Sequence, residues 1–198
     1  MTKQLSLTIL LTLIHLVVAG QDYKFLLGGT LGTSIDNEEA IESDIIDSKQ
    51  SNFNFSGLFG YYLTNRIILG TEISHEITKT NKKGVNPSET KSLDYIVSPF
   101  LRYYFNQAFV QAQGNVGKSK YTHNGDLYFL DDYYDMDIEN NHNIFGWGIG
   151  IGYDFKLSTR LLLEPIVKYN SNKHTDKVSD FDLKRNGLSL HIGLAFKL

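Results

Sequence analysis

Hydrophobic and polar residues alternate with a period of two along most of this chain. The stretch 145–155 reads Phe-Gly-Trp-Gly-Ile-Gly-Ile-Gly-Tyr-Asp-Phe, with glycine at every second position between large apolar residues. Such a period is typical of a β-strand, whose successive side chains point to opposite faces. Glycine weakens a strand unless a neighbour must approach the backbone closely. The glycine face is therefore predicted to be the crowded inner face, with the apolar side chains outside.

Alternating segments recur throughout the chain after residue 20, without a helical period. Their length is about ten residues, which is the pattern expected of strands in a membrane barrel. They predict eight strands, near 23–33, 51–63, 66–78, 92–105, 108–120, 144–155, 160–170 and 187–198.

The predicted connections alternate between short and long. Tight turns at 64–66, 106–107 and 156–159 follow clusters of aromatic residues, and long loops are expected at 34–50, 79–91, 121–143 and 171–186. Short turns at one rim and long loops at the other are typical of outer-membrane barrels. The pattern therefore predicts an all-β fold, a transmembrane antiparallel up-and-down β-barrel of eight strands, over residues 21–198.

Alternation alone does not say whether the apolar face points toward lipid or into a core. A soluble barrel or sandwich has the same period with its apolar face inside. The apolar faces here carry almost no charge, and His75 is the one unexpected residue on the apolar face of 66–78. Lipid requires this, since Lys or Arg at mid-depth costs about 2–4 kcal/mol. The opposite faces are rich in Gly, Ser, Asn and Gln, so we predict that the apolar faces contact lipid.

Residues 1–20 have the pattern of a signal peptide. Lys3 precedes an apolar run at 5–18, and small residues stand before Gln21. The run is too short for a transmembrane helix, which needs about 20 residues. A buried N-terminal helix is the alternative interpretation. We expect export and residence in the cell outer membrane.

Composition removes several classes of function. The 198 residues suit one domain, and a formal net charge of −3 does not indicate nucleic-acid binding. The chain has no Cys, which excludes disulfides, thiolate metal sites and a lipid anchor on cysteine. We expect no cofactor and no metal site.

The C-terminal residues carry the most specific motif. In His191-Ile-Gly193-Leu-Ala-Phe196-Lys-Leu198, a polar residue is followed by glycine two positions later and by hydrophobic residues at the antepenultimate and last positions. With these residues the chain resembles the small eight-stranded outer-membrane barrels, the OmpX/OmpA-like group. The resemblance implies that His191, Gly193, Phe196 and Leu198 form the signal read by the barrel-assembly machinery, although Leu198 replaces the usual terminal Phe. An ordinary amphipathic strand is the alternative.

Ionisable residues on the predicted inner faces form the first candidate site. We expect a polar network in the lumen, with the pairs Arg102–Glu164 and Glu72–Lys168. A static network that satisfies a polar core is favoured over a gated path for water or ions. Its predicted members are Glu72, Arg102, Gln111, Glu164, Lys168 and His191.

The predicted loop 121–143 is the second candidate site. It combines clustered acids with exposed aromatics and contains no Lys or Arg. Aromatic residues anchor protein interfaces, whereas carboxylates suit hard cations, but no EF-hand spacing is present. A hydrated rim, a protein-binding surface and a metal site remain as alternatives. The candidate interaction residues are Tyr128, Phe129, Asp131, Asp132, Tyr133 and Tyr134.

An enzyme that modifies lipid A is a further class to consider, because some barrels of this size deacylate it. The catalytic signature of such barrels resembles His-x-Ser-Asn near the outer end of a late strand, with a carboxylate that orients the histidine. Here Tyr169 stands where the histidine is needed before Ser171, and His174 falls on the other face of the strand. We predict no catalysis.

The predicted role is therefore structural or interactive, through contacts made by the loops. A narrow pore for small solutes or ions is the alternative, and a lipid A-modifying enzyme ranks third. The expected partners are outer-membrane lipid and lipopolysaccharide, the barrel-assembly machinery and a surface protein, and the barrel is expected to be a monomer.

Overall fold

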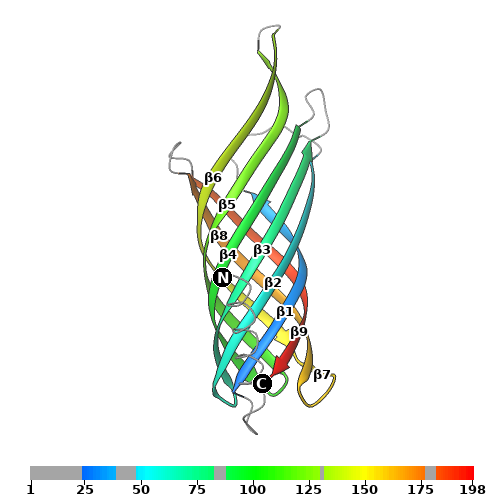
Figure 1. Cartoon of the computed structure of the whole chain (residues 1–198), viewed down its shortest axis with the longest axis vertical. Helices are drawn as coiled ribbons and strands as arrows, with labels where there is room; N and C mark the ends of the chain where they lie inside the picture. Colours follow the sequence, from blue (N-terminus) through cyan, green and yellow to red (C-terminus); the bar gives the residue numbers. More distant parts are fainter. Residues whose placement is uncertain (1–23, 39–47, 83–87, 130–131, 177–181) are drawn as a thin grey trace, which may run out of the picture.

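The computed structural model describes residues 24–38, 48–82, 88–129, 132–176 and 182–198, which form a closed antiparallel barrel (Figure 1). Neighbouring strands pair in chain order, β1 pairs with β9, and β6 pairs with β8 to close the wall. The strands are β1 (Phe25–Glu38), β2 (Ser48–Thr64), β3 (Ile67–Lys82), β4 (Ser88–Phe105), β5 (Ala108–Phe129), β6 (Asp132–Tyr153), β7 (Phe155–Lys156), β8 (Leu161–Asp176) and β9 (Asp182–Lys197).

Eight of these strands build the wall, which confirms the predicted fold. The remaining one, β7, has two residues and pairs only with the start of β8. The described part of the chain contains no helix long and apolar enough to cross a membrane. The predicted signal peptide, residues 1–20, lies outside the described residues.

The two faces of the wall have the predicted orientation. Ile149, Ile151 and Val167 point outward and are 49%, 64% and 50% exposed, whereas Glu72 is 4% exposed. The glycines of β6 face inward, where a Cβ at Gly152 would meet the Phe109 ring. The glycine face is therefore the crowded inner face. A narrow barrel leaves little room inside, and the glycines make space there for the larger side chains of neighbouring strands.

The strands are longer than predicted. β5 and β6 contain 22 residues each, and their register continues from Ala108↔Tyr153 to Phe129↔Asp132. The prediction of a loop at 121–143 is therefore wrong for its described residues, and the other three predicted loops are shortened in the same way. Alternation of apolar and polar residues stops where strands leave the lipid, but backbone pairing continues, so the pattern marks only the apolar band.

The β5–β6 hairpin rises beyond the other strands at the end opposite the short turns (Figure 1). Spanning a membrane takes about 9–11 residues of a tilted strand. Roughly half of each of these strands is therefore left for the region beyond the apolar band.

Short turns close the opposite rim. The β4–β5 turn at Asn106 and Gln107 has two residues, and Asn106 has a φ of 63°. Asn tolerates this left-handed conformation better than most residues, which suits a tight hairpin. All three tight turns predicted from the sequence lie at this rim.

Candidate functional site

Arg102 of β4 lies in the barrel interior near the short-turn rim. Its Nη1 donates to both carboxylate oxygens of Glu164 on β8, at 3.0 and 3.1 Å, and its Nε donates to Oε1 of Gln111 at 3.1 Å. The Phe109 ring covers the guanidinium, with 3.9 Å between Cζ and the ring centroid. Arg102 and Glu164 are completely buried. Attraction and hydrogen bonds must offset the desolvation of such a pair, and both are present here.

An apolar cluster fills the barrel around this ion pair. Its members come from every strand of the wall except β6, and they lie close to the short turns. The inner faces as a whole are rich in Gly, Ser, Asn and Gln, as predicted, but at this end they are mainly apolar. An eight-stranded barrel is narrow enough for side chains to fill its interior, and apolar ones do so here. The cluster consists of Leu26, Leu58, Ile68, Phe100, Tyr104, Phe109, Leu162, Ile166 and Ala195.

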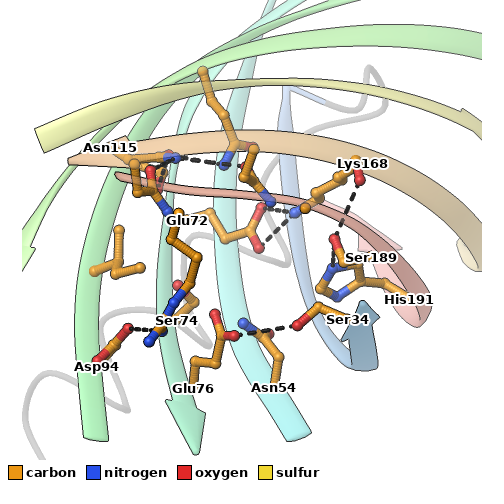
Figure 2. Close-up of a pocket in the computed structure, with 17 residues that line it drawn as sticks. Ser34, Asn54, Glu72, Ser74, Glu76, Asp94, Asn115, Lys168, Ser189 and His191 are labelled. Atoms are coloured by element: carbon orange, nitrogen blue, oxygen red, sulfur yellow. Dashed lines mark hydrogen bonds and ion pairs between the residues drawn. The ribbon is translucent and has the colours of Figure 1, made fainter. Parts of the chain in front are cut away.

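A second ion pair crosses the barrel above this cluster. Nζ of Lys168 on β8 donates to the two carboxylate oxygens of Glu72 on β3, at 2.7 and 2.6 Å (Figure 2). Both side chains are buried. The pair therefore ties two separated parts of the wall together through charge-assisted hydrogen bonds.

His191 lies beside this pair on β9. Its Nε2 is 2.8 Å from Oγ of Ser189, and its Nδ1 is 3.5 Å from Oγ1 of Thr30. Thr30 in turn lies 2.8 Å from Oγ of Ser56. The imidazole is thus part of a chain of hydroxyl contacts that links β9, β1 and β2.

Amide side chains continue the network along β5. Gln111 donates to Gln113 at 2.9 Å, and Gln113 donates to Asn115 at 3.0 Å. Asn115 then donates to Oδ1 of Asn172 on β8 at 2.9 Å. All six residues predicted for the lumen network are buried inside the barrel, and both predicted pairs lie within ion-pair distance.

A third ion pair lies in the barrel and was not predicted from the sequence. Nη1 of Arg185 on β9 lies 3.4 Å from Oδ2 of Asp94 on β4, and Asp94 also accepts from Ser92 and Ser119 at 2.6 and 2.5 Å. Arg185 falls within the predicted loop 171–186. Its position six residues before His191 keeps the inner-face period of two, and this signal is present in the sequence.

A polar cavity lies between the Glu72–Lys168 pair and the outer end of the barrel (Figure 2). Its lining combines carboxylates, cations, amides and hydroxyls from most strands of the wall. The cavity has room for water, whereas the apolar cluster below it is packed with side chains. The labelled lining residues are Ser34, Asn54, Glu72, Ser74, Glu76, Asp94, Asn115, Lys168, Ser189 and His191.

Five of the six predicted loop-interaction residues lie on β5 and β6, which corrects their assignment to a loop. Tyr128 is the register partner of Tyr133, and Phe129 is the partner of Asp132. Tyr134 follows on β6, whereas Asp131 lies outside the described residues. The hairpin backbone therefore fixes the spacing of these residues, which a loop would leave variable.

The predicted assembly residues lie at the seam that closes the barrel. His191 and Gly193 face inward on β9, and Phe196 faces outward. Leu198 N donates to Phe25 O at 2.9 Å, so the end of the chain is bonded to β1. Recognition of these residues by assembly machinery stays a prediction.

The residues considered for catalysis do not form a catalytic pair. Tyr169 is 40% exposed on the outer face and His174 is buried on the inner face, while Ser171 has the outward phase of β8. Ser171 and His174 thus lie on opposite sides of the wall. In the described ranges no group of His, Asp and Glu is arranged to hold a metal ion.

Asp154 lies in the turn after β6, outside the membrane-spanning strands, and is buried. Its backbone nitrogen donates to Gln107 O at 2.8 Å. Burial, followed by the negative charge of Glu164, raises the pKa of Asp154 from its ordinary 3.8 to about 7, against the opposing charges of Arg102 and Lys197. The carboxyl is therefore easier to protonate in the folded barrel than in the unfolded chain.

This pKa predicts a pH-dependent stability. Because the pKa of Asp154 is higher in the folded barrel than in the unfolded chain, protonation of Asp154 stabilises the folded state. This contribution is fully present below about pH 4 and is lost as the pH rises to about 7. We expect Asp154→Asn to remove that loss, so that the variant gains unfolding free energy relative to the wild type between these pH values. Urea unfolding in vesicles, followed by the fluorescence of Trp147, measures the difference. A difference that is constant with pH would contradict the prediction.

Known proteins with a similar sequence pattern or structure are also barrels of the outer membrane. The family model described as the autotransporter beta-domain matches residues 28–193. Neisserial surface protein A is 12% identical over 88% of this chain and 97% of its own, with a TM-score of 0.51. A major outer membrane protein from Thermus thermophilus is 10% identical over 88% of this chain and 99% of its own, with a TM-score of 0.53. These structures share the fold, and no curated protein matches.

Proposed function

This chain belongs to the autotransporter beta-domain family, and we propose that it is an outer-membrane barrel with a structural and surface-interaction role, close in kind to the OmpX/OmpA-like barrels. The filled interior near the short turns carries this proposal. Two fully bonded ion pairs and an apolar cluster occupy the barrel, while the β5–β6 hairpin projects beyond the other strands. A filled interior suits a rigid support, and a projecting hairpin suits contact with a partner.

The charge of the hairpin defines the partner that it suits. Residues 121–140 contain no Lys or Arg, so we propose that the hairpin contacts a basic protein surface through carboxylates and aromatic rings. The acids in this stretch are Asp126, Asp131, Asp132, Asp135, Asp137 and Glu139.

The register shows where the hairpin can be shortened for a test. Lys120 and Asn141 are partners, so residues 121–140 can be replaced by an Asn-Gly turn without changing the barrel below. Cells that display the intact protein are expected to adhere to an immobilised basic protein such as lysozyme several-fold more than cells with the shortened protein. Adhesion to an acidic protein is the control. Equal adhesion by both proteins would contradict the proposal.

The alternative function, a narrow pore, draws support from the polar cavity. The apolar cluster argues against it, because an ion would have to pass beside buried Arg102 and displace packed side chains. We expect no steady single-channel openings in planar bilayers. Openings that change in Glu164→Gln would instead favour the pore.

A further inference from the structure

Four lysines project from the outer wall of β3, β4 and β5. Lys79 and Lys91 are directly opposite each other in register, and Lys118 and Lys120 stand on the next strand beside β4. All four are exposed. Like charges that face each other across strands are destabilising, so this arrangement carries a cost that a bound anion would offset.

Acids are scarce beside Lys79, Lys91 and Lys118 on the outer face. The outward positions from His75 to Lys79 on β3, and their register partners on β4 and β5, contain no Asp or Glu. Among the residues that the structure describes, none forms an ion pair with Lys79, Lys91 or Lys118. Glu72, Glu76 and Asp94, which lie on β3 and β4, line the polar cavity inside the barrel instead.

An apolar groove lies on the outer wall directly below the lysines. Gly57 leaves it open, since a Cβ at that position would meet nothing within 4 Å. The His75 ring closes its upper end, with its centroid 5.0 Å from the Phe55 ring and 4.4 Å from the Tyr95 ring. The groove is lined mainly by Phe55, Gly57, Ile73, Tyr95, Val97 and Val116.

The position of the groove relative to the membrane follows from β4. Tyr103 and Tyr95 both face outward and stand eight positions apart along the strand. That spacing is roughly 26 Å along the strand and roughly 20 Å along the barrel axis at a typical tilt, close to the height of an apolar band. Tyr residues favour the membrane–water interface. Lys91, four positions beyond Tyr95, therefore reaches the headgroup level of the leaflet opposite the short turns.

We propose that this surface, the basic groove, binds a phosphorylated glycolipid of the outer leaflet. The phosphates contact Lys79, Lys91, Lys118 and Lys120, and an acyl chain lies in the groove beside Gly57. A soluble polyanion would use the lysines alone, whereas a lipid uses both the charge and the adjoining apolar groove. The inference rests on the proposed insertion in an outer membrane.

The charge part is tested with a matched pair of variants. Lys173 and Lys184 are also opposite in register and exposed, but on β8 and β9. The folded full chain in phosphatidylcholine nanodiscs is titrated with bisphosphorylated lipid A, and bound lipid is counted by native mass spectrometry. Lys79→Gln/Lys91→Gln is expected to weaken binding about tenfold, and Lys173→Gln/Lys184→Gln much less. Equal losses would overturn the inference in favour of a general surface charge.

The groove part is tested by filling it. Gly57→Leu places a side chain in open space, so the barrel is expected to fold while lipid binding falls several-fold. Gly114→Leu is the control, because a Cβ there also meets nothing within 4 Å and Gly114 does not line the groove. Dephosphorylated lipid A is expected to bind weakly. If Gly57→Leu binds both heparin and lipid A as well as the wild type does, the lysines form a site for soluble polyanions. That result would overturn the inference.

Failure of this inference is distinguishable from failure of the proposed function. A folded membrane barrel shifts in apparent mass on a gel after boiling, and every variant is first checked in this way. If the shift occurs and lipid A binding is unaffected by Lys79→Gln/Lys91→Gln, the basic groove is wrong and the membrane barrel stands. If the shift is missing from the wild type, the proposed membrane insertion itself fails.

Discussion

Replacing Glu164 by glutamine should lower the free energy of unfolding by about 3–5 kcal/mol, because it leaves a buried charge without its partner. Arg102 is completely buried, bonds both oxygens of Glu164 and lies against the Phe109 ring. Glutamine keeps the shape of Glu164 but cannot balance the guanidinium. Urea unfolding in phospholipid vesicles, followed by Trp147, the single tryptophan of the chain, measures the loss.

The double variant Arg102→Met/Glu164→Leu is the control for this prediction. Removing both charges leaves no ion to desolvate, and apolar replacements of buried pairs are often neutral or stabilising. The surrounding apolar cluster offers suitable neighbours for both new side chains. The double variant is therefore expected to be more stable than Glu164→Gln. A double variant that is less stable than Glu164→Gln would show that the pair contributes more through its hydrogen bonds than through charge balance.

Placing lysine at Ile149 should destabilise the barrel in a bilayer by about 2–4 kcal/mol. Ile149 faces outward halfway along the apolar stretch of β6, between Tyr153 and Phe145. Lysine at this depth exposes an ammonium group to hydrocarbon. The same unfolding experiment in vesicles reports the loss, and it tests the orientation of the wall directly.

Leu157→Lys is the matched control for the lipid-facing variant. Leu157 is 56% exposed and lies in the short connection between β7 and β8, outside the strands. A charge near the interface costs only about 0–1 kcal/mol. Equal effects at Ile149 and Leu157 would mean that Ile149 does not face hydrocarbon.

The interior was predictable in part. The period of two places Arg102, Glu164, Glu72 and Lys168 on inner faces, and the structure joins them as the two pairs named from the sequence. Arg185 was missed, because its segment has the composition of a loop although its phase matches the inner face. A pair across the barrel depends on strand register and stagger, which no local pattern reports.

The limits of the strands were the least predictable feature of the fold. Apolar alternation records contact with lipid, so it ends near residue 120 on β5, whereas backbone pairing continues to Phe129. Beyond the lipid, strand geometry is maintained by cross-strand hydrogen bonds, which leave only a weak trace in composition. The sequence therefore predicted a loop around Tyr128 and Tyr133, although the two are register partners on a hairpin.

Local alternation was enough to predict the number of wall strands, the position of the short turns and the direction in which each side chain points, because the period of a strand involves only neighbours in the chain. What meets across the barrel became visible only in the folded molecule. There Asp94 pairs with Arg185, nine residues pack into an apolar cluster, and Lys79 aligns with Lys91 above the groove at Gly57. These contacts unite residues far apart in the chain, and the closure of the barrel sets their distances.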